Sequence, residues 1–336
     1  MRVLILHSPV LKNASPDDLD TLVQAKAVKA ALQRLGYSVT NAPFHSHPER
    51  LAELVRKARP SLIFNLVESI WGRGAFAAVA LQAIERTGIP VTGGSASSMA
   101  TTGDKVLAKT NLVRAGLPTP DWAEGPSWTG LERHKKWIVK AADEDASLGI
   151  DDDALVEGYS AVLSRAEYCF ARYGCRWFAE QYIDGREFNV SLLERDGLPQ
   201  VLPIAEMRFE DWSPNRPRIV GYNAKWDEED DTFLNTVRSF DWVDNEPELN
   251  ATLTRLSREC WNLFDCRGYA RVDYRVDSGG QPYILEINTN PSLEPGSGLA
   301  AAANEAELTY DELIEHICRI ALENEAKRFS KHRNAS

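Results

Sequence analysis

The stretch at residues 269–291, YARVDYRVDSGGQPYILEINTNP, constrains this chain more than any other. Two runs of alternating apolar residues flank a Gly-Gly pair at 279–280, a pattern typical of a β-hairpin. Asp273 and Glu286 lie about equally far from the turn, so strand pairing brings their carboxylates together, and Asn288 leaves the same face as Glu286. These oxygens are the ligands that Mg²⁺ prefers. The hairpin therefore predicts a metal site; the alternative is a surface hairpin with solvated acids.

The composition of the chain limits which binding partners and which cellular compartment we expect. The chain has 336 residues, of which 43% are hydrophobic and 26% charged, as in an ordinary globular protein of two or three domains. A net charge of −11 without a long basic stretch argues against a nucleic-acid partner. No apolar run reaches the roughly 18 residues of a membrane span, and the start is too weakly basic for a signal peptide. The five cysteines are odd in number and lack metal-ligand spacing, so we expect buried thiols in a cytoplasmic enzyme.

The first third of the chain alternates strand and helix patterns. The expected elements are a strand at 2–6, a helix at 19–35, a strand from Val39, a helix at 49–58 and a strand at 61–66. This order predicts a Rossmann-like parallel sheet. Ligands of such sheets bind beyond the carboxyl ends of the strands, which suggests a substrate role for Glu68 and the loop at 72–74. The alternative for Glu68 is a solvated loop acid.

The hairpin also carries a family resemblance. Its Arg-x-Asp strand and the Leu-Glu-Ile-Asn-Thr-Asn-Pro segment resemble the metal-binding end of the ATP-grasp fold, as found in D-alanine–D-alanine ligase and its relatives. The resemblance extends over roughly residues 60–320. It implies an α/β chain, an ATP-grasp fold with an N-terminal Rossmann-like parallel-sheet domain. The expected divisions are the N-terminal domain at 1–96, a central subdomain at 97–188, a C-terminal subdomain with the metal site at 189–323, and a disordered polar tail at 324–336.

A set of nucleotide-binding residues follows from the same resemblance. They are Lys105, Lys140, Ser147, Glu180, Tyr182, Ile183 and Glu187. The two lysines would contact the phosphates and adenine, and Ser147 lies in the loop that covers the triphosphate. In the hinge segment EQYIDGREFNV, Glu180 would accept from the adenine amino group and Glu187 from the ribose hydroxyls, with the backbone at 182–183 reading the ring edge. Without the resemblance, Lys105 reads as a surface helix lysine and the hinge as a plain hairpin.

Four residues are candidates for catalysis or substrate binding: Arg271, Lys225, Ser297 and Glu68. The resemblance assigns Arg271 to the transferred phosphoryl group, although a structural ion pair is the alternative. Lys225 lies in YNAKW, which resembles the family's mobile Y-x-A-K-Y loop, with Trp226 in place of the tyrosine. Ser297 matches a substrate-binding serine.

The substrate side departs from the family pattern. Glu68 occupies the position of a histidine near the first substrate, and Ala146 that of a serine that anchors it. Three acids at 143–145 are unfavourable beside a triphosphate unless they face solvent or Mg²⁺. The resemblance therefore supports the ATP site more firmly than any particular substrate.

These features predict an ATP-dependent carboxylate–amine ligase that forms an acyl phosphate and releases ADP and phosphate. Asp273, Glu286 and Asn288 would hold two Mg²⁺ ions, with Mn²⁺ as a substitute. The partners would be an amino acid or small carboxylate plus an amine, with no nucleic acid and no membrane, and the resemblance implies a homodimer. Two alternatives stay open: a true D-alanine–D-alanine ligase of peptidoglycan synthesis, and a nucleotide-binding regulatory protein that has lost catalysis.

Overall fold

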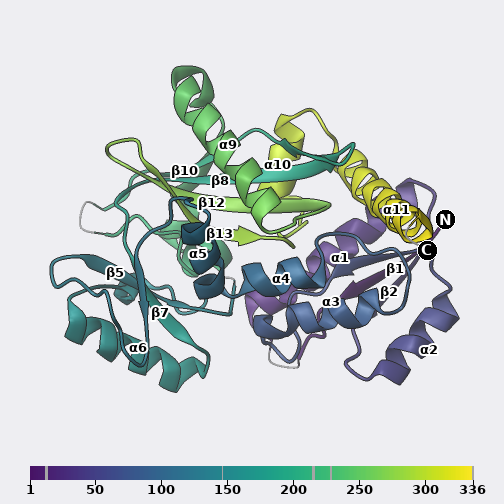
Figure 1. Ribbon diagram of the computed structural model, residues 1–336, viewed down its shortest axis with the longest axis horizontal. Coiled ribbons are helices and arrows are strands. Elements are labelled where there is room, and N and C mark those ends of the chain that lie inside the picture. The colour runs from purple at the N-terminus through teal and green to yellow at the C-terminus, as the bar shows by residue number, and fades with distance from the viewer. Residues whose placement is uncertain (12–13, 146, 214–215, 228, 335–336) are drawn as a thin grey trace.

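The computed structural model contains three β-sheets with helices around them (Figure 1). It describes residues 1–11, 14–145, 147–213, 216–227 and 229–334. Ala146, singled out above, lies outside these residues.

The N-terminal sheet is the parallel sheet that the sequence predicts. Its central strand β1 (Arg2–His7) pairs in parallel with β2 (Ser38–Pro43) and with β3 (Leu62–Leu66). Helices α1 (Pro16–Arg34) and α2 (Pro48–Ala58) form the two connections. All of β3 and all of β1 after Arg2 are buried, because continuous apolar runs suit strands that are covered on both faces.

Two details follow β3. The segment at 89–93 forms a single parallel bridge, between Val91 and Ile63. The helical stretch at 96–114 is divided into two helices, because Asp104 caps the second helix by accepting from the backbone N–H of Leu107 at 3.0 Å. The helical elements of this region are η1 (Gly74–Phe76), α3 (Ala77–Glu85), α4 (Ala96–Gly103) and α5 (Lys105–Arg114).

The central sheet is antiparallel, in the order β4-β7-β5-β6. Its elements are β4 (Trp122–Glu124), β5 (Lys136–Ala141), η2 (Asp152–Ala154), β6 (Leu155–Glu157), α6 (Tyr159–Tyr173) and β7 (Trp177–Gln181). Helix α6 packs against the sheet through Val162, Ala166 and Cys169, which share a core with Trp137 and Trp177. This layer of helix and sheet leaves the other face of the strands available for a ligand.

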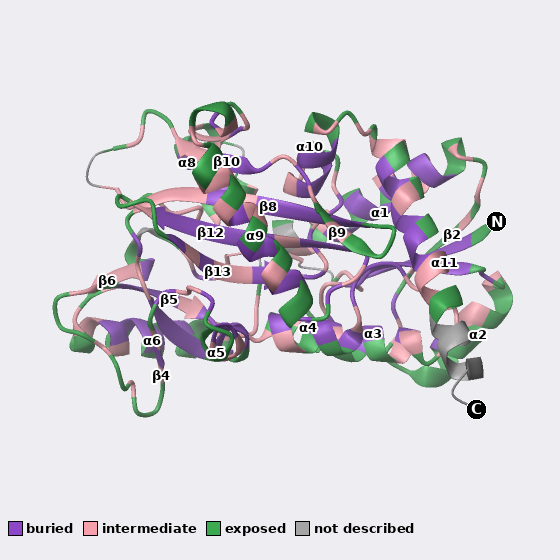
Figure 2. Ribbon diagram, turned by 45° about the horizontal axis from the view of Figure 1, so that its top comes forward, coloured by how far each residue is buried: buried purple, intermediate pink, exposed green. Residues whose placement is uncertain are grey.

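The C-terminal sheet has the order β11-β10-β8-β12-β13, with β9 paired to β8. Its strands are β8 (Gly185–Arg195), β9 (Leu198–Val201), β10 (Ala205–Phe209), β11 (Thr236–Ser239), β12 (Tyr269–Asp277) and β13 (Pro282–Asn288). The helical elements of this part of the chain are α7 (Asn223–Trp226), α8 (Asp231–Leu234), η3 (Val243–Asn245), α9 (Pro247–Leu263) and α10 (Gly298–Glu305). The central strands β8 and β12 are the most buried (Figure 2). The boundary expected at residue 188 falls inside β8, so the change of sheet occurs between Gln181 and Gly185 instead.

The last helix corrects the expectation of a disordered tail. Helix α11 (Tyr310–Asn334) continues through residues 324–334, and residues 335–336 lie outside the described part. The Asn324 side chain donates to Glu194 Oε2 at 2.9 Å, which ties the start of the expected tail to the C-terminal sheet. A capping box begins this helix: the Thr309 N–H donates to the Glu312 carboxylate, and the Glu312 N–H donates to Thr309 Oγ1.

Helix α11 returns to the N-terminal domain, where it lies beside α1 (Figure 1). Leu313, Ile314 and Ile317 share one buried core with Val3 and Phe64. The two ends of the chain therefore fold around a common core, and the N-terminal domain is completed by residues from the C-terminus.

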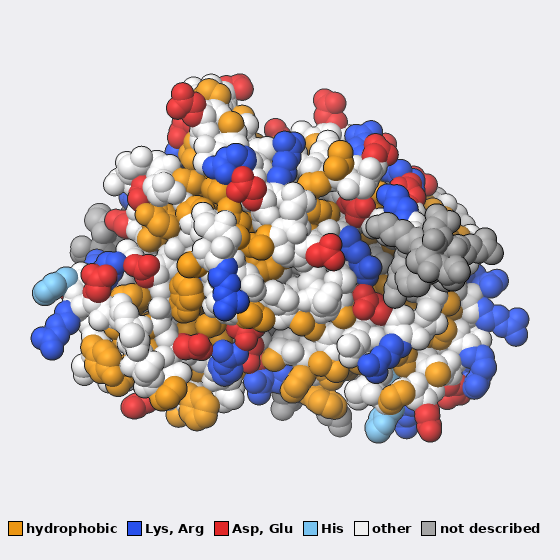
Figure 3. Space-filling model, in the orientation of Figure 1, with side chains coloured by type: hydrophobic (Ala, Val, Ile, Leu, Met, Phe, Trp, Pro, Cys, Tyr) orange, Lys and Arg blue, Asp and Glu red, His pale blue; other side chains and the backbone are white. Residues whose placement is uncertain are grey.

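All five cysteines are buried free thiols, as expected. None of the described helices has the length and apolar character that a membrane crossing requires. On the face shown in Figure 3, basic and acidic side chains are interspersed.

Candidate active site

The β12–β13 hairpin brings the predicted metal-binding residues together. The register places Asp273 opposite Glu286 and Arg271 opposite Asn288. The pairing shifts between Asp273 and Tyr274, which is the signature of a β-bulge. Because of this shift Leu285 and Glu286 both line the same cavity, although they are neighbours in sequence.

Positive charges surround both carboxylates. Arg271 donates to both oxygens of Asp273, at 2.8 and 2.9 Å, and Asn189 donates to one of them at 2.9 Å. Glu286 lies 3.6 Å from Lys105 Nζ and 4.0 Å from an Arg271 nitrogen. Burial by itself would raise the pKa of Glu286, but the cations Lys105, Lys225 and Arg271 outweigh it and lower that pKa. Glu286 is thus held in the charged form that binds a cation.

The donor set fits magnesium. Two carboxylates and the Asn288 amide oxygen are hard ligands, and the Asn288 oxygen is held by the backbone N–H of Asn290 at 2.8 Å. Within the described residues, no three His, Cys, Asp or Glu side chains gather as metal ligands. An ion at the hairpin would therefore need oxygens from a bound phosphate or water to complete its coordination.

A cavity of about 820 Å³, partly open to solvent, lies between the central and C-terminal sheets. Ten of the predicted residues line it: Lys105, Lys140, Ser147, Glu180, Tyr182, Ile183, Glu187, Lys225, Asp273 and Glu286.

The wall of the cavity formed by the central sheet contains a buried charge cluster around Glu180. Its side chain is fully buried, with Lys109 Nζ 2.7 Å from one oxygen and Lys140 bonded to the other. Burial would raise the pKa of Glu180, but the two lysines lower it. Lys109 also donates to Thr119 Oγ1 at 2.6 Å and to Pro120 O at 3.1 Å. The sequence analysis missed Lys109, although its position four residues after Lys105 on one helix was a usable signal.

The hinge beside this cluster is held by an unpredicted arginine. The Tyr182 N–H donates to Lys136 O at 2.9 Å, so this amide takes part in strand pairing, and the Arg275 guanidinium lies over the Tyr182 ring, 5.5 Å from its centroid. The Ile183 carbonyl accepts from Arg275 Nε at 3.0 Å. Burial raises the pKa of Glu187, and the facing Arg275 opposes this effect. Arg275 lies two residues after Asp273, and strand alternation could have placed it on the same face.

The acidic loop after β5 contacts cations of the protein itself. Glu144 accepts from Arg73 Nε at 2.7 Å and from the Gly74 N–H at 2.6 Å. Asp145 lies 3.0 Å from Lys105 Nζ. These contacts explain how the acids are accommodated beside Lys105, and they join the loop to the N-terminal domain.

The remaining candidates lie outside the cavity. Glu68 follows the carboxyl end of β3, where Gln24 donates to it at 3.0 Å. Ser297 precedes α10 and donates to Ser292 O at 2.7 Å. Asn290, just after β13, donates to Val67 O at 3.4 Å. Residues at the end of the hairpin thus connect the wall of the cavity with the surroundings of Glu68.

With this geometry in view, comparison with known proteins identifies the family. The family model described as "D-ala D-ala ligase C-terminus" matches residues 134–319. The chain belongs to the D-alanine–D-alanine ligase family. The D-alanine–D-alanine ligase of Methylococcus capsulatus is 30% identical over 300 residues, with 88% of this chain and 90% of that protein covered. An uncharacterized protein y4sG of Sinorhizobium fredii is 33% identical, with 88% and 87% covered.

Solved structures support the same fold. The crystal structure of the Bacillus anthracis D-alanine–D-alanine ligase complexed with ATP aligns with a TM-score of 0.75 at 22% identity, covering 98% of this chain and 99% of that one. The fold is therefore ATP-grasp with a parallel N-terminal sheet, as expected. As a member of this family, the chain is an ATP-dependent carboxylate–amine ligase that forms carbon–nitrogen bonds.

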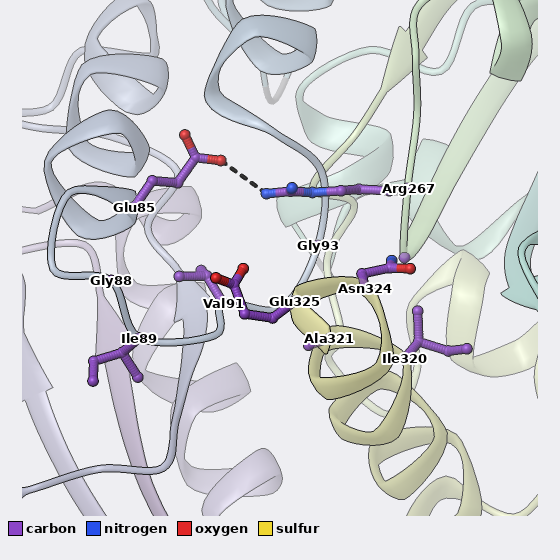
Figure 4. A pocket seen from close by; sticks show the side chains of 11 residues that line it. Glu85, Gly88, Ile89, Val91, Gly93, Arg267, Ile320, Ala321, Asn324 and Glu325 are labelled. Carbon is purple, nitrogen blue, oxygen red and sulfur yellow. Dashed lines mark hydrogen bonds and ion pairs between the residues drawn. The ribbon is translucent and has the colours of Figure 1, made fainter. Parts of the chain in front are cut away.

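A second cavity of the ligase, of about 450 Å³, contains none of the predicted site residues. It lies where the end of α3 and the loop at 88–93 meet α11 (Figure 4). Arg267 crosses it to pair with Glu85 at 2.8 Å. This ion pair links the N-terminal domain to the segment that leads into β12.

Proposed function

We propose that this ligase activates the carboxylate of an amino acid, or of a similar small acid, with ATP and joins it to the amine of a second substrate. One observation carries the proposal: the Glu180 cluster, on the central sheet, and the Asp273–Glu286 pair, on the C-terminal sheet, line a single cavity. The same cavity thus offers acceptors for an adenine amino group and a pair of carboxylates for a metal ion at the phosphates.

The nucleotide roles follow from this arrangement. Glu180 accepts from the adenine amino group and Glu187 from the ribose hydroxyls, since carboxylates are strong acceptors. Lys140 and Lys105 contact the phosphates. Ser147 and its loop cover the triphosphate.

Asp273, Glu286 and Asn288 would hold magnesium, with two ions and Mn²⁺ as a substitute. When bound, magnesium supplies neutralisation of the charge on the β- and γ-phosphates. Lys105 and Arg271 neutralise the remaining charge.

The reaction has two steps. A carboxylate oxygen attacks the γ-phosphorus, the bond to the ADP oxygen breaks, and an acyl phosphate forms. The free amine then attacks the carbonyl carbon, phosphate leaves with the bonding electrons, and the amine loses a proton. Arg271 stabilises the transferred phosphoryl group and the oxyanion, and closure of the loop that carries Lys225 excludes water.

The substrates would bind near Glu68 and Ser297. Glu68 favours an amino group, or a substrate with an additional positive charge. D-alanine with D-alanine is a second candidate pair, favoured by the relative of that name in Methylococcus capsulatus. The glutamate at position 68 counts against this pair, because the family pattern has a histidine there.

A pairwise screen of L- and D-amino acids, with ADP release and product mass as readouts, tests the proposal. ADP formed only with particular pairs, together with the mass of the joined product, supports the ligase. Product from D-alanine alone would select the second candidate. Nucleotide binding without turnover in any pool would contradict the proposal.

The Glu68→Gln variant tests the substrate assignment separately. We expect its KM for the accepted amine to rise, while the KM for ATP stays near the wild-type value. An unchanged KM for every accepted substrate would remove Glu68 from the site.

We also infer that the ligase is cytoplasmic and forms a homodimer. The five buried thiols support a reducing compartment. Light scattering during size-exclusion chromatography would measure the mass in solution, and a mass of one chain would contradict the dimer.

A further inference from the structure

We propose that Arg275 is a positioning residue of the nucleotide site, which holds the adenine hinge, the ribose-side carboxylate and the segment at 218–222 in one arrangement. This inference rests on the proposed function of the same cavity. It concerns a residue to which the sequence analysis gave no role.

Arg275 is almost completely buried in the wall of the cavity, with 4% of its surface exposed. Its guanidinium makes four contacts with acceptors. They are Ile183 O at 3.0 Å, Gly185 O at 3.0 Å, Arg218 O at 2.8 Å and Glu187 Oε2 at 3.3 Å. The planar fork of donors reaches several segments at once, which the single ammonium of a lysine cannot do.

The identity of these acceptors indicates positioning. A buried charge is costly unless it is paired and hydrogen-bonded. Three of the four acceptors of Arg275 are backbone carbonyls, and they belong to the hinge and to the segment at 218–222. A side chain that served only to neutralise Glu187 would need none of these carbonyls.

The segment at 218–222 is also fixed from the opposite side of the cavity. Ser147 donates to Val220 O at 3.2 Å, and the Tyr222 N–H donates to Ile150 O at 2.9 Å. A side chain at Gly221 would come within 2.7 Å of the same carbonyl, so only glycine permits this approach. The segment therefore spans from the central sheet to the C-terminal sheet along the cavity, and Arg275 is its anchor on the C-terminal side.

This arrangement predicts which part of the nucleotide depends on Arg275. Its contacts lie at the hinge and at Glu187, whereas Lys105 and Asp273 lie at the phosphate end. Loss of the guanidinium should weaken binding of AMP, ADP and Mg-ATP by a similar factor. It should also relax discrimination at the ribose hydroxyls, because Glu187 loses the partner that orients it.

The experiment compares Arg275→Met, Arg275→Lys and the control Arg208→Met in the full-length chain. Arg208 is an arginine of the same sheet that pairs with a glutamate, 3.5 Å from Glu206, and does not line the cavity. Calorimetry measures the affinity for AMP, ADP and Mg-ATP. Steady-state kinetics with ATP, 2′-deoxy-ATP and 3′-deoxy-ATP measures the ribose discrimination.

We expect Arg275→Met to weaken binding of all three nucleotides about 10- to 100-fold, the loss typical when a side chain that orients a metal ligand is removed. The KM for ATP should rise while kcat at saturating ATP changes little, and the preference for ATP over at least one deoxy analogue should fall. Arg275→Lys should retain part of the nucleotide affinity that Arg275→Met loses. Arg208→Met should have the affinity and the ribose discrimination of the wild type.

Several outcomes would overturn the inference. One is a nucleotide affinity of Arg275→Met equal to that of the wild type. Another is an Arg275→Met protein with lower thermal stability but unchanged ribose discrimination, which would make Arg275 a purely structural residue. If Arg275→Met does not fold, the preference of Arg275→Lys for ATP over the two deoxy analogues decides. A preference below that of the wild type supports the inference, and an unchanged preference overturns it. A wild-type protein that binds no Mg-ATP would instead contradict the proposed function.

Discussion

At the scale of single residues, the site depends on buried carboxylates that are paired with cations. Lys109 and Lys140 pair with Glu180, and Arg271 pairs with Asp273. Each of these pairs is at least partly desolvated, so loss of one member leaves the other charge without compensation.

Lys109→Met should destabilise the folded protein strongly. The substitution leaves the fully buried Glu180 with Lys140 alone, and breaking a buried pair costs about 3–5 kcal/mol. Urea unfolding of the variant measures the free energy. The control Lys57→Met removes an exposed ion pair of the same length, 2.7 Å to Glu53, and should have little effect. Equal stabilities of the two variants would contradict this account of the cluster.

Arg271→Met should reduce kcat more than it affects nucleotide affinity. If Arg271 stabilises the transferred phosphoryl group, kcat falls by about 100- to 1,000-fold, as for loss of one preorganised donor. Steady-state assays of ADP release measure kcat, and calorimetry with Mg-ATP measures nucleotide affinity. Arg255→Met, which removes an exposed helix pair with Glu259, is the control. A kcat within a few-fold of the wild type would reduce Arg271 to a structural partner of Asp273.

At the scale of elements, the site depends on how closely β8 and β12 approach each other. Gly185 begins β8 opposite Asp277, with a φ of 154°. A Cβ at this position would lie 2.0 Å from Val276 O. The absence of a side chain therefore lets the hinge turn directly into the sheet beside Arg275.

Gly185→Ala should separate the two strands at this point. Overpacking of this kind typically costs about 1–3 kcal/mol, and a clash with backbone belongs at the upper end of that range. Thermal and urea unfolding measure the loss, and nucleotide affinity should fall with it because the hinge moves. Gly103→Ala is the control, since a Cβ there meets nothing within 4 Å. Wild-type stability and affinity in Gly185→Ala would refute the close-approach argument.

At the scale of the whole molecule, ion pairs connect parts of the chain that are distant in sequence. Arg73 with Glu144 joins the N-terminal domain to the loop over the cavity, and Arg267 with Glu85 joins it to the start of β12. The first of these contacts holds the loop near Lys105, and so it connects the predicted substrate edge to the cavity that Lys105 lines.

Arg73→Gln should alter catalysis more than stability. Arg73 is partly exposed, so loss of the pair should cost about 1 kcal/mol or less. The loop would close less often over the nucleotide, and kcat and the KM for ATP should change together, as is usual when closure is impaired. Parallel kinetics and urea unfolding test this, with Glu144→Gln as the reciprocal variant. If both variants have wild-type kinetics, the bridge has no role in closure.

Local patterns in the sequence determined a large part of this protein. Continuous apolar runs specified the parallel strands β1 and β3, and the alternation on both sides of a Gly-Gly turn set Asp273 opposite Glu286. These features depend on neighbours within a few residues or across one turn, where the periodicity of strands and helices applies directly.

Only the tertiary structure decided the long-range contacts. It placed α11 against α1, extended that helix through the expected tail, paired Lys109 with Glu180, and brought Arg275 to the hinge and to Arg218. Each of these contacts joins segments whose separation in sequence bears no fixed relation to their distance in space. They form because a buried charge or an apolar face must find a partner somewhere in the fold, and the packing of the three sheets determines which partner is within reach.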